Sequence, residues 1–338
     1  NTSYDSQNST YKAEDYAFSK LKERYKKWTG NSFDDKDLVS FGLVNEQGNL
    51  INAGALLADE SPIRCSRLFC TRWNGLNKSG GAVDALDDAE YSGSVISLIE
   101  NGEAFIKRNC KMKWRKTANS REEMPEYVER SYHEALVNAL AHRDYLVNGS
   151  EVHIDIYDDR MEIYSPGGMP DGSVIQDRDP LTVPSTRRNP VLADVFNRLG
   201  YMERKGSGFG KIISGYEFQI NYSEGKRPTF RSDRYQFTVV MPNLNYEVSQ
   251  DFEENETMSE LMSESMSESM SESMSELERT RMQIILHYLD TNKEINSSIA
   301  AKLLKVEIKT AGRLLSKAAK LDILNSYGKT KNKVYFRE

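Results

Sequence analysis

An acidic low-complexity repeat near the C-terminus divides the chain into two parts that each need a core of their own. From Met258 to Ser275 the sequence repeats Met-Ser-Glu followed by one variable residue, so methionine recurs every four residues. Such a uniform, charged segment buries too little apolar surface to fold by itself, and we expect residues 244–277 to form a linker. The alternative is a helix, because four residues approximate one turn and the methionine stripe would provide a weak dimer seam.

Charge is distributed unevenly on the two sides of this repeat. The chain of 338 residues carries a net charge of -6, but the segment from Glu278 to Glu338 contains thirteen basic and six acidic residues, a net charge of +7. The remainder therefore carries -13. This asymmetry is typical of a module that faces nucleic acid and is joined to an acidic body.

The basic segment has the pattern of three helices followed by two strands. Helices are expected over residues 278–290, over 296–304, where Asn296 or Ser297 is the N-cap, and from residue 309 onward. This order is typical of a winged helix-turn-helix, whose third helix enters the major groove of duplex DNA while the wing contacts phosphates. The alternative is a domain of this fold that contacts protein. The residues expected to contact DNA are Lys309, Thr310, Arg313 and Lys317 in the third helix and Lys329, Lys331 and Lys333 in the wing.

The sequence before the repeat predicts an α+β chain. Residues 1–10 are polar and are expected to fray. Amphipathic helices are expected over residues 11–28, 90–110 and 121–145, with Pro125 near the entry of the last. Alternating apolar residues predict strands over 66–73, 151–166 and 233–242, the second folded as a hairpin at Asp158-Asp159. We expect an N-terminal α+β segment at residues 1–118, a pocket domain at 119–243 and a winged helix at 278–338.

Three cysteines, Cys65, Cys70 and Cys110, form no CxxC pair and have no nearby histidine in the sequence. This pattern favours free thiols in a reducing compartment over disulfides or a zinc site. No apolar stretch approaches the roughly 20 residues of a membrane span. We therefore expect a cytoplasmic protein with no membrane partner.

One expected helix of the body carries three polar side chains in line. In the run HEALVNALAHRD, Glu134, Asn138 and His142 are spaced four residues apart and share one helix face. A carboxylate can orient or deprotonate a water, and an asparagine oxygen is a good ligand for Mg²⁺. The spacing predicts one wall of a binding site, and a solvated stripe is the alternative.

Two glycine-rich stretches follow this helix. They are SPGGMP at residues 165–170 and RKGSGFGK at residues 204–211. Glycine lets backbone N–H groups approach an anion closely at the start of a helix. Either stretch alone is also compatible with a tight turn, and only their order after the polar helix favours a nucleotide pocket.

The order of Glu-x-x-x-Asn on a helix, a hairpin ending in a glycine turn, and G-x-G-x-G resembles the Bergerat ATP-binding fold of gyrase, histidine kinases and mismatch-repair ATPases. The runs HEALVNALAHRDY, EIYSPGG, RNPVLADVF and GYMERKGSGFGKI resemble more closely a bacterial family of transcriptional regulators that carry helicase-like or divergent AAA labels. The resemblance covers roughly residues 40–243 and implies a Bergerat-like, GHKL-type α/β sandwich. In that family a Schlafen AlbA-like domain usually precedes the module. Residues 1–118 would then hold a remnant of that domain and its connector.

This resemblance implies ATP and Mg²⁺ as ligands. It places Glu134 where water is activated and Asn138 where Mg²⁺ is bound. At Ser165, ATPases of this fold usually carry an aspartate that accepts a hydrogen bond from the adenine amino group, so a serine weakens the expectation of adenine specificity. Arg187 and Arg188 would reach phosphates. The residues expected at the nucleotide site are Asn138, His142, Ser165, Gly167, Gly168, Arg204, Gly206, Gly208 and Gly210.

Three functions are compatible with these patterns. The first is a DNA-binding transcriptional regulator whose pocket senses a nucleotide or another ligand, with duplex DNA and a second copy of the chain as partners. The second is a Mg²⁺-dependent ATPase whose hydrolysis drives dimerisation or clamp motion, and the third is a scaffold with a degenerate pocket. A helicase motor is not expected, because the stretch nearest to a P-loop, GSGFGKI, has the wrong spacing and places Ile212 where a serine or threonine should bind Mg²⁺.

Overall fold

The computed structural model describes residues 2–78, 84–203, 208–247, 274–321, 323–328 and 333–336. The chain divides into two compact units, Asn1–Glu247 and Val248–Glu338, which we call the body and the C-terminal unit. Each is described by itself. Among the described residues, no helix combines the length and the apolar character that crossing a membrane requires.

A six-stranded sheet forms the centre of the body, in the order β4-β3-β7-β8-β10-β9. The pair β3 and β7 is parallel, and the other neighbours are antiparallel. Because β3 and β4 precede residue 118 and the other four strands follow it, residues 1–118 and 119–243 share one sheet and one core. The strands are β3 (Arg67–Trp73), β4 (Ala85–Ser92), β7 (Val152–Ile156), β8 (Arg160–Pro166), β9 (Thr229–Ser232) and β10 (Gln236–Pro242).

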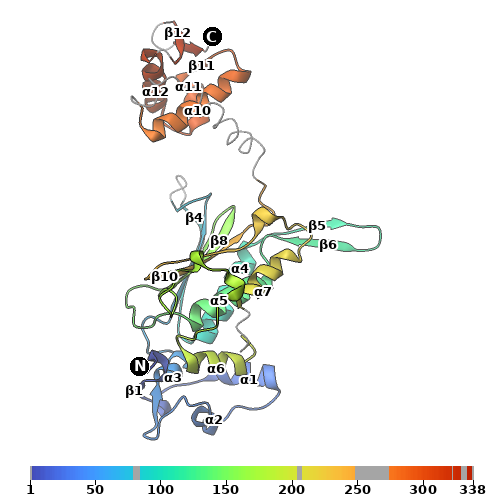
Figure 1. The fold of residues 1–338 in the computed structure, drawn as a ribbon, viewed down its shortest axis with the longest axis vertical. Helices are drawn as coiled ribbons and strands as arrows, with labels where there is room; N and C mark the ends of the chain where they lie inside the picture. Colours follow the sequence, from blue (N-terminus) through green and yellow to red (C-terminus); the bar gives the residue numbers. More distant parts are fainter. Residues whose placement is uncertain are drawn as a thin grey trace. The chain divides into compact units, whose positions relative to one another are not determined.

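Helices pack on one face of this sheet (Figure 1). α4 (Val95–Asn109) packs on β3 and β7, α5 (Glu129–Ala141) packs on β8 and β10, and α7 (Gly208–Glu217) packs on α5. A Cβ atom on Gly102 of α4 would lie 2.7 Å from Leu136 Cδ2 and 2.8 Å from Leu68 Cδ2. Glycine at this position therefore lets α4 approach both α5 and the sheet, and the apolar faces of these helices complete the core.

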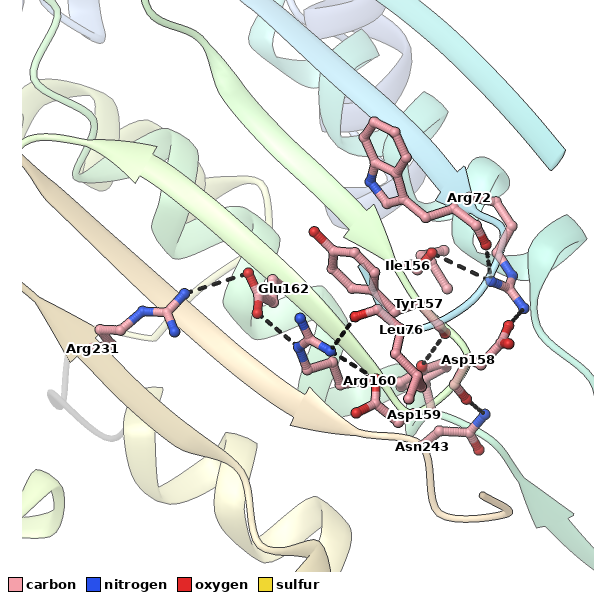
Figure 2. A network of polar contacts seen from close by, with 12 residues as sticks. Arg72, Leu76, Ile156, Tyr157, Asp158, Asp159, Arg160, Glu162, Arg231 and Asn243 are labelled. Atoms are coloured by element: carbon pink, nitrogen blue, oxygen red, sulfur yellow. Dashed lines mark hydrogen bonds and ion pairs between the residues drawn. The ribbon is translucent and has the colours of Figure 1, made fainter. Parts of the chain in front are cut away.

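Polar contacts hold the turn of the β7–β8 hairpin, which lies at the expected position, Asp158-Asp159 (Figure 2). Arg72 Nη2 of β3 donates to Asp158 Oδ1 at 2.7 Å, and Asn243 Nδ2 donates to the Asp158 carbonyl at 2.9 Å. Nearby, Glu162 forms ion pairs with Arg160 and with Arg231 of β9. These contacts hold the strands at one end of β8, and Ser165 lies at the opposite end.

The expected helix over residues 121–145 is wrong in its first turns, because α5 begins only at Glu129. Residues 121–125 instead form β6 (Arg121–Pro125), which pairs with β5 (Met112–Lys116) in a two-stranded hairpin. Arginine and glutamate favour a helix locally, but here strand pairing across a short turn overrides that preference. Pro125 consequently ends a strand and does not open a helix.

The expected fraying of residues 1–10 is also wrong for the described residues. Asp5 is fully buried, and its Oδ2 accepts a hydrogen bond from the Leu192 backbone N–H at 2.9 Å, near the start of α6. The expected helix over residues 11–28 begins only at Ser19, since β1 runs to Lys12. The remaining elements of the body are η1 (Tyr4–Ser6), β1 (Asn8–Lys12), η2 (Ala13–Asp15), α1 (Ser19–Thr29), α2 (Asp35–Ser40), β2 (Asn49–Ile51), α3 (Asn52–Leu57), η3 (Ile175–Asp177), η4 (Pro180–Thr182), α6 (Pro190–Arg198) and η5 (Glu224–Lys226).

The C-terminal unit contains three helices and a small sheet in the order β11-β13-β12. Met274 is buried in its core and Ser275 caps α10, whereas Leu244 is buried in the core of the body. Both ends of the expected linker at 244–277 therefore belong to folded units, and the methionines from Met258 to Met270 lie outside the described residues. The elements are α10 (Glu276–Thr291), β11 (Ile295–Asn296), α11 (Ser297–Leu304), α12 (Ile308–Lys320), β12 (Asn325–Tyr327) and β13 (Val334–Phe336).

Candidate functional site

One pocket of the body gathers side chains from α5, the turn after β8 and the start of α7. It has a polar part and an apolar part. The polar part includes Glu134, Asn138, His142 and Ser165, together with the main chain of Gly167, Gly168 and Gly208. The apolar part includes Ile163, Met169, Val183, Met202, Phe209, Ile212, Phe237 and Val239.

Glu134 and Asn138 form the polar wall on α5. Glu134 is buried, and Asn138 Nδ2 donates to Glu134 Oε1 at 3.2 Å. Because the amide nitrogen of Asn138 makes this bond, its amide oxygen is the atom that it can offer to a cation. A carboxylate and an amide oxygen are hard ligands that suit Mg²⁺, which needs few protein ligands when waters and phosphates complete its shell.

Lys211 of α7 does not line the pocket but pairs with Glu134, which does, and the sequence analysis missed it. Its Nζ lies 3.8 Å from Glu134 Oε2 and 3.1 Å from Glu203 Oε1, and its side chain is only 14% exposed. Residues three apart share a helix face, so its spacing from Gly208 was the signal that could have found it. Lys211 balances the charge of Glu134, which makes this carboxylate less available as a free base.

Gly208 begins α7 directly against the polar wall. A Cβ atom there would lie 2.8 Å from Asn138 Nδ2 and 3.1 Å from Glu134 Oε1. The first N–H groups of a helix have no partner within the helix and carry a partial positive charge, so an anion is favoured at this end. Gly210 does not line the pocket, and Arg204 and Gly206 fall outside the described residues.

Ser165 at the end of β8 is buried, and its Oγ donates to the Ala139 carbonyl at 2.7 Å. The hydroxyl proton is therefore used to join β8 to α5. Toward a nucleotide base, Ser165 can therefore act only as a hydrogen-bond acceptor, through the remaining lone pairs of its hydroxyl oxygen.

The glycine turn after β8 requires both of its glycines. Gly167 has a φ of +98°, and a Cβ atom on Gly168 would lie 2.1 Å from the Asp233 carbonyl oxygen. Arg188 donates to the Gly168 carbonyl at 2.6 Å and forms an ion pair with Asp144 at 3.1 Å. Arg188, which the sequence suggested as a phosphate contact, thus holds the turn in place.

His142 lies just beyond the end of α5. The helix ends at Ala141, so His142 does not extend the helical face of Glu134 and Asn138, although it still lines the pocket. Burial lowers the pKa of His142 to about 4, and Arg188 and Arg187 contribute to the same shift. The imidazole is therefore neutral at pH 7.

This shift predicts a loss of stability in acid. The unfolded histidine has a pKa near 6.5, so the unfolded chain binds a proton that the folded chain excludes. The contribution of neutral His142 is present above about pH 6.5 and is lost as the pH falls through about 4. We expect His142→Gln to reduce the difference in unfolding free energy between about pH 7 and about pH 5 by on the order of 1 kcal/mol, measured by urea denaturation.

His133 provides a control of opposite sign. Desolvation lowers its pKa, but the hydrogen bond and charge of Glu103 raise it above the ordinary value on balance. Its contribution is present below about pH 6.5 and is lost as the pH rises through the folded pKa. His133→Gln should therefore increase the acid loss, and an unchanged pH profile for both variants would contradict the assignment.

In the C-terminal unit, α12 presents its basic residues unequally. Lys309 and Arg313 are exposed, whereas Thr310 is half-buried. Lys317 donates to Glu278 Oε2 of α10 at 2.6 Å. Of the expected wing residues, Lys333 lies with its Nζ 5.2 Å from the centroid of the Tyr335 ring. Lys329 and Lys331 lie outside the described residues.

A comparison with known protein families bears on the body. Residues 149–241 match the family model described as "Putative ATP-dependent DNA helicase recG C-terminal". The matched region begins after α5, so Glu134 and Asn138 precede it. No curated protein matches the chain.

The crystal structure of the DIP2311 protein from Corynebacterium diphtheriae is similar in fold. It has a TM-score of 0.58 and 17% sequence identity, and the match covers all of this chain and 64% of that one. The present chain thus spans less than two thirds of the length of this relative. Taken with the family match, the mixed sheet and its helices form an α+β fold that contains an ATPase-like domain.

Proposed function

We propose that this chain is a DNA-binding transcriptional regulator whose ATPase-like domain binds ATP with Mg²⁺. The observation that carries the proposal is the pocket, where the Glu134–Asn138 pair and the N-terminus of α7 meet an apolar compartment. Phe209 and Phe237 stack there with ring centroids 5.7 Å apart. The compartment suits a base, the helix N-terminus suits phosphates, and the Asn138 oxygen suits the cation.

Binding is preferred over turnover because of the surroundings of Glu134. Its carboxylate accepts a hydrogen bond from Asn138 and lies near Lys211, so its charge is already partly satisfied. A carboxylate paired in this way is better suited to a site that binds and senses a nucleotide than to a general base that removes a proton from water. Hydrolysis is the second candidate, since Glu134 lines the pocket.

Two measurements test this part of the proposal. Calorimetric titration of the full chain with ATP and Mg²⁺ should give saturable binding, and a chain that binds no nucleotide would contradict the proposal and leave a pocket for another ligand or the scaffold alternative. Phosphate release should stay at the background rate. Steady release that disappears in Glu134→Gln would establish the ATPase instead.

The C-terminal unit is proposed to bind duplex DNA. The order of α10, α11 and α12 followed by β12 and β13 supports a winged helix, and the segment from Glu278 carries a net charge of +7. In such a domain the exposed face of the third helix enters the major groove. The exposure of Lys309 and Arg313 on α12 supports this role for them.

The Lys317–Glu278 ion pair predicts a ranking among the basic residues of α12. We expect Arg313→Ala to weaken duplex binding about 10-fold and Lys317→Ala to weaken it less than about 2-fold. Lys317 contributes less because its charge is already compensated by Glu278. Fluorescence anisotropy with a labelled duplex measures both constants. An equal loss in the two variants would contradict the ranking, and no loss in either would argue against DNA binding by this helix.

A further inference from the structure

The β5–β6 hairpin stands apart from the layers of the body. Figure 1 shows its two strands extending away from the sheet and from the helices that cover it. Every residue of β5 (Met112–Lys116) is exposed. Five antiparallel residue pairs, from Met112 opposite Pro125 to Lys116 opposite Arg121, give a ribbon about 17 Å long at the usual rise of a strand. This hairpin buries little apolar surface, so packing in the core does not explain which residues it contains.

One face of the hairpin combines aromatic, apolar and basic side chains. Residues two apart in a strand point to the same side, so Met112, Trp114 and Lys116 share a face. Trp114 is 55% exposed and Met112 is 49% exposed. The guanidinium carbon of Arg121 lies 4.8 Å from the centroid of the Trp114 ring. An exposed tryptophan beside the Arg121 guanidinium is typical of a surface that contacts a partner.

The hairpin is also a basic projection on an acidic body. Residues 112–125 contain four basic and two acidic side chains, a net charge of +2, while residues 1–247 as a whole carry -4. Both acidic side chains are already paired within the hairpin, Glu122 with Arg115 at 2.6 Å and Glu123 with Arg121 at 3.5 Å. The ribbon therefore carries net positive charge on a body whose net charge is negative, and a polyanion is a complementary partner.

We propose that the β5–β6 hairpin is a second contact with duplex DNA, separate from the C-terminal unit. A two-stranded ribbon fits the major groove, which is about 12 Å wide. Lys116 and its basic neighbours meet phosphates, while Trp114 and Met112 make apolar contacts with thymine methyl groups in the groove. This contact rests on the hairpin alone and does not require that the C-terminal unit bind DNA.

The test uses the full chain and a fluorescently labelled duplex of about 30 base pairs, titrated at several salt concentrations. We expect Trp114→Ala with Lys116→Ala to weaken binding about 10-fold and to reduce the slope of log K against log salt by about 1. The matched control is Phe218→Ala with Lys36→Ala, which also removes one exposed aromatic and one exposed lysine from the body. This control should bind as the wild type does.

Two further measurements separate a contact at the hairpin from a contact at the C-terminal unit. In Trp114→Phe, which keeps an aromatic ring, the change in tryptophan fluorescence on adding duplex should disappear while binding persists. The hairpin double substitution in a Lys309→Ala, Arg313→Ala background should lose a further factor of about 10. If the background substitutions have no effect and the hairpin variant still weakens binding, the proposal for the C-terminal unit fails and the hairpin contact stands.

Equal duplex affinity of the hairpin variant and the control would overturn the proposal. Sedimentation equilibrium identifies the competing occupant. If the hairpin variant changes the oligomeric state and leaves duplex affinity unchanged, the ribbon contacts a second copy of the chain and not DNA.

Discussion

A chain carrying Asn138→Ala is expected to bind ATP with Mg²⁺ at least about 100-fold more weakly than the wild type. The substitution removes the amide oxygen that would bind the cation. It also removes the hydrogen bond that orients the Glu134 carboxylate, since Asn138 Nδ2 donates to Glu134 Oε1 at 3.2 Å. The cation would lose its amide ligand, and the Glu134 carboxylate would no longer be oriented. Both the cation and the triphosphate should therefore bind more weakly. Calorimetric titration measures the change in Kd.

Folding should not account for this loss. Alanine is the strongest helix former, and position 138 lies in the interior of α5, so the thermal midpoint should change little. Asn148→Ala is the matched control, because Asn148 is exposed in the loop after α5 and does not line the pocket. Unchanged nucleotide affinity in a folded Asn138→Ala chain would remove this residue from the site and contradict the Mg²⁺ assignment.

Arg143→Met is expected to lower the unfolding free energy of the body by about 3 kcal/mol. Arg143 is fully buried, and its guanidinium donates to the carbonyls of Asp144 at 2.7 Å and Val147 at 3.0 Å, and to that of Ser150. It also lies against the Tyr145 ring at 4.9 Å. Methionine has a similar volume but no donor, so all three hydrogen bonds would be lost, at about 1 kcal/mol or more each. Of the three carbonyls, that of Asp144 would keep the Val147 N–H at 3.2 Å. Urea denaturation of the full chain measures the difference.

Arg198→Met is the control for this substitution. Arg198 pairs with Asp194 one turn earlier on α6, and its side chain is 41% exposed, so its removal should cost less than about 1 kcal/mol. A similar cost for the two variants would show that the buried carbonyls around Arg143 find other donors.

Much of the pocket follows from local sequence. The four-residue spacing of Glu134 and Asn138 places them on one face of any helix, and their hydrogen bond follows from that spacing. Gly167 and Gly168 were identifiable because only glycine tolerates the backbone of such a turn. The basic composition after Glu278 likewise needs no tertiary structure to be recognised. In each case the physical cause lies within a few residues of the chain.

Other features depend on contacts between distant residues, and the sequence alone could not predict them. Arg121–Pro125 has helix-favouring residues but pairs with Met112–Lys116 as a strand, which decides the hairpin. Asp5 is buried only because the start of α6, 187 residues later, supplies an N–H donor.

The ion pairing of Glu134 in the pocket also depends on contacts between distant residues. Lys211 reaches Glu134 only because Gly208 lets α7 begin against α5. The sequence by itself therefore determined which groups the pocket and the basic segment contain, since periodicity and backbone constraints act locally. Only the tertiary structure decided which of those groups are paired and which remain exposed, because burial and long-range pairing depend on the whole packed core.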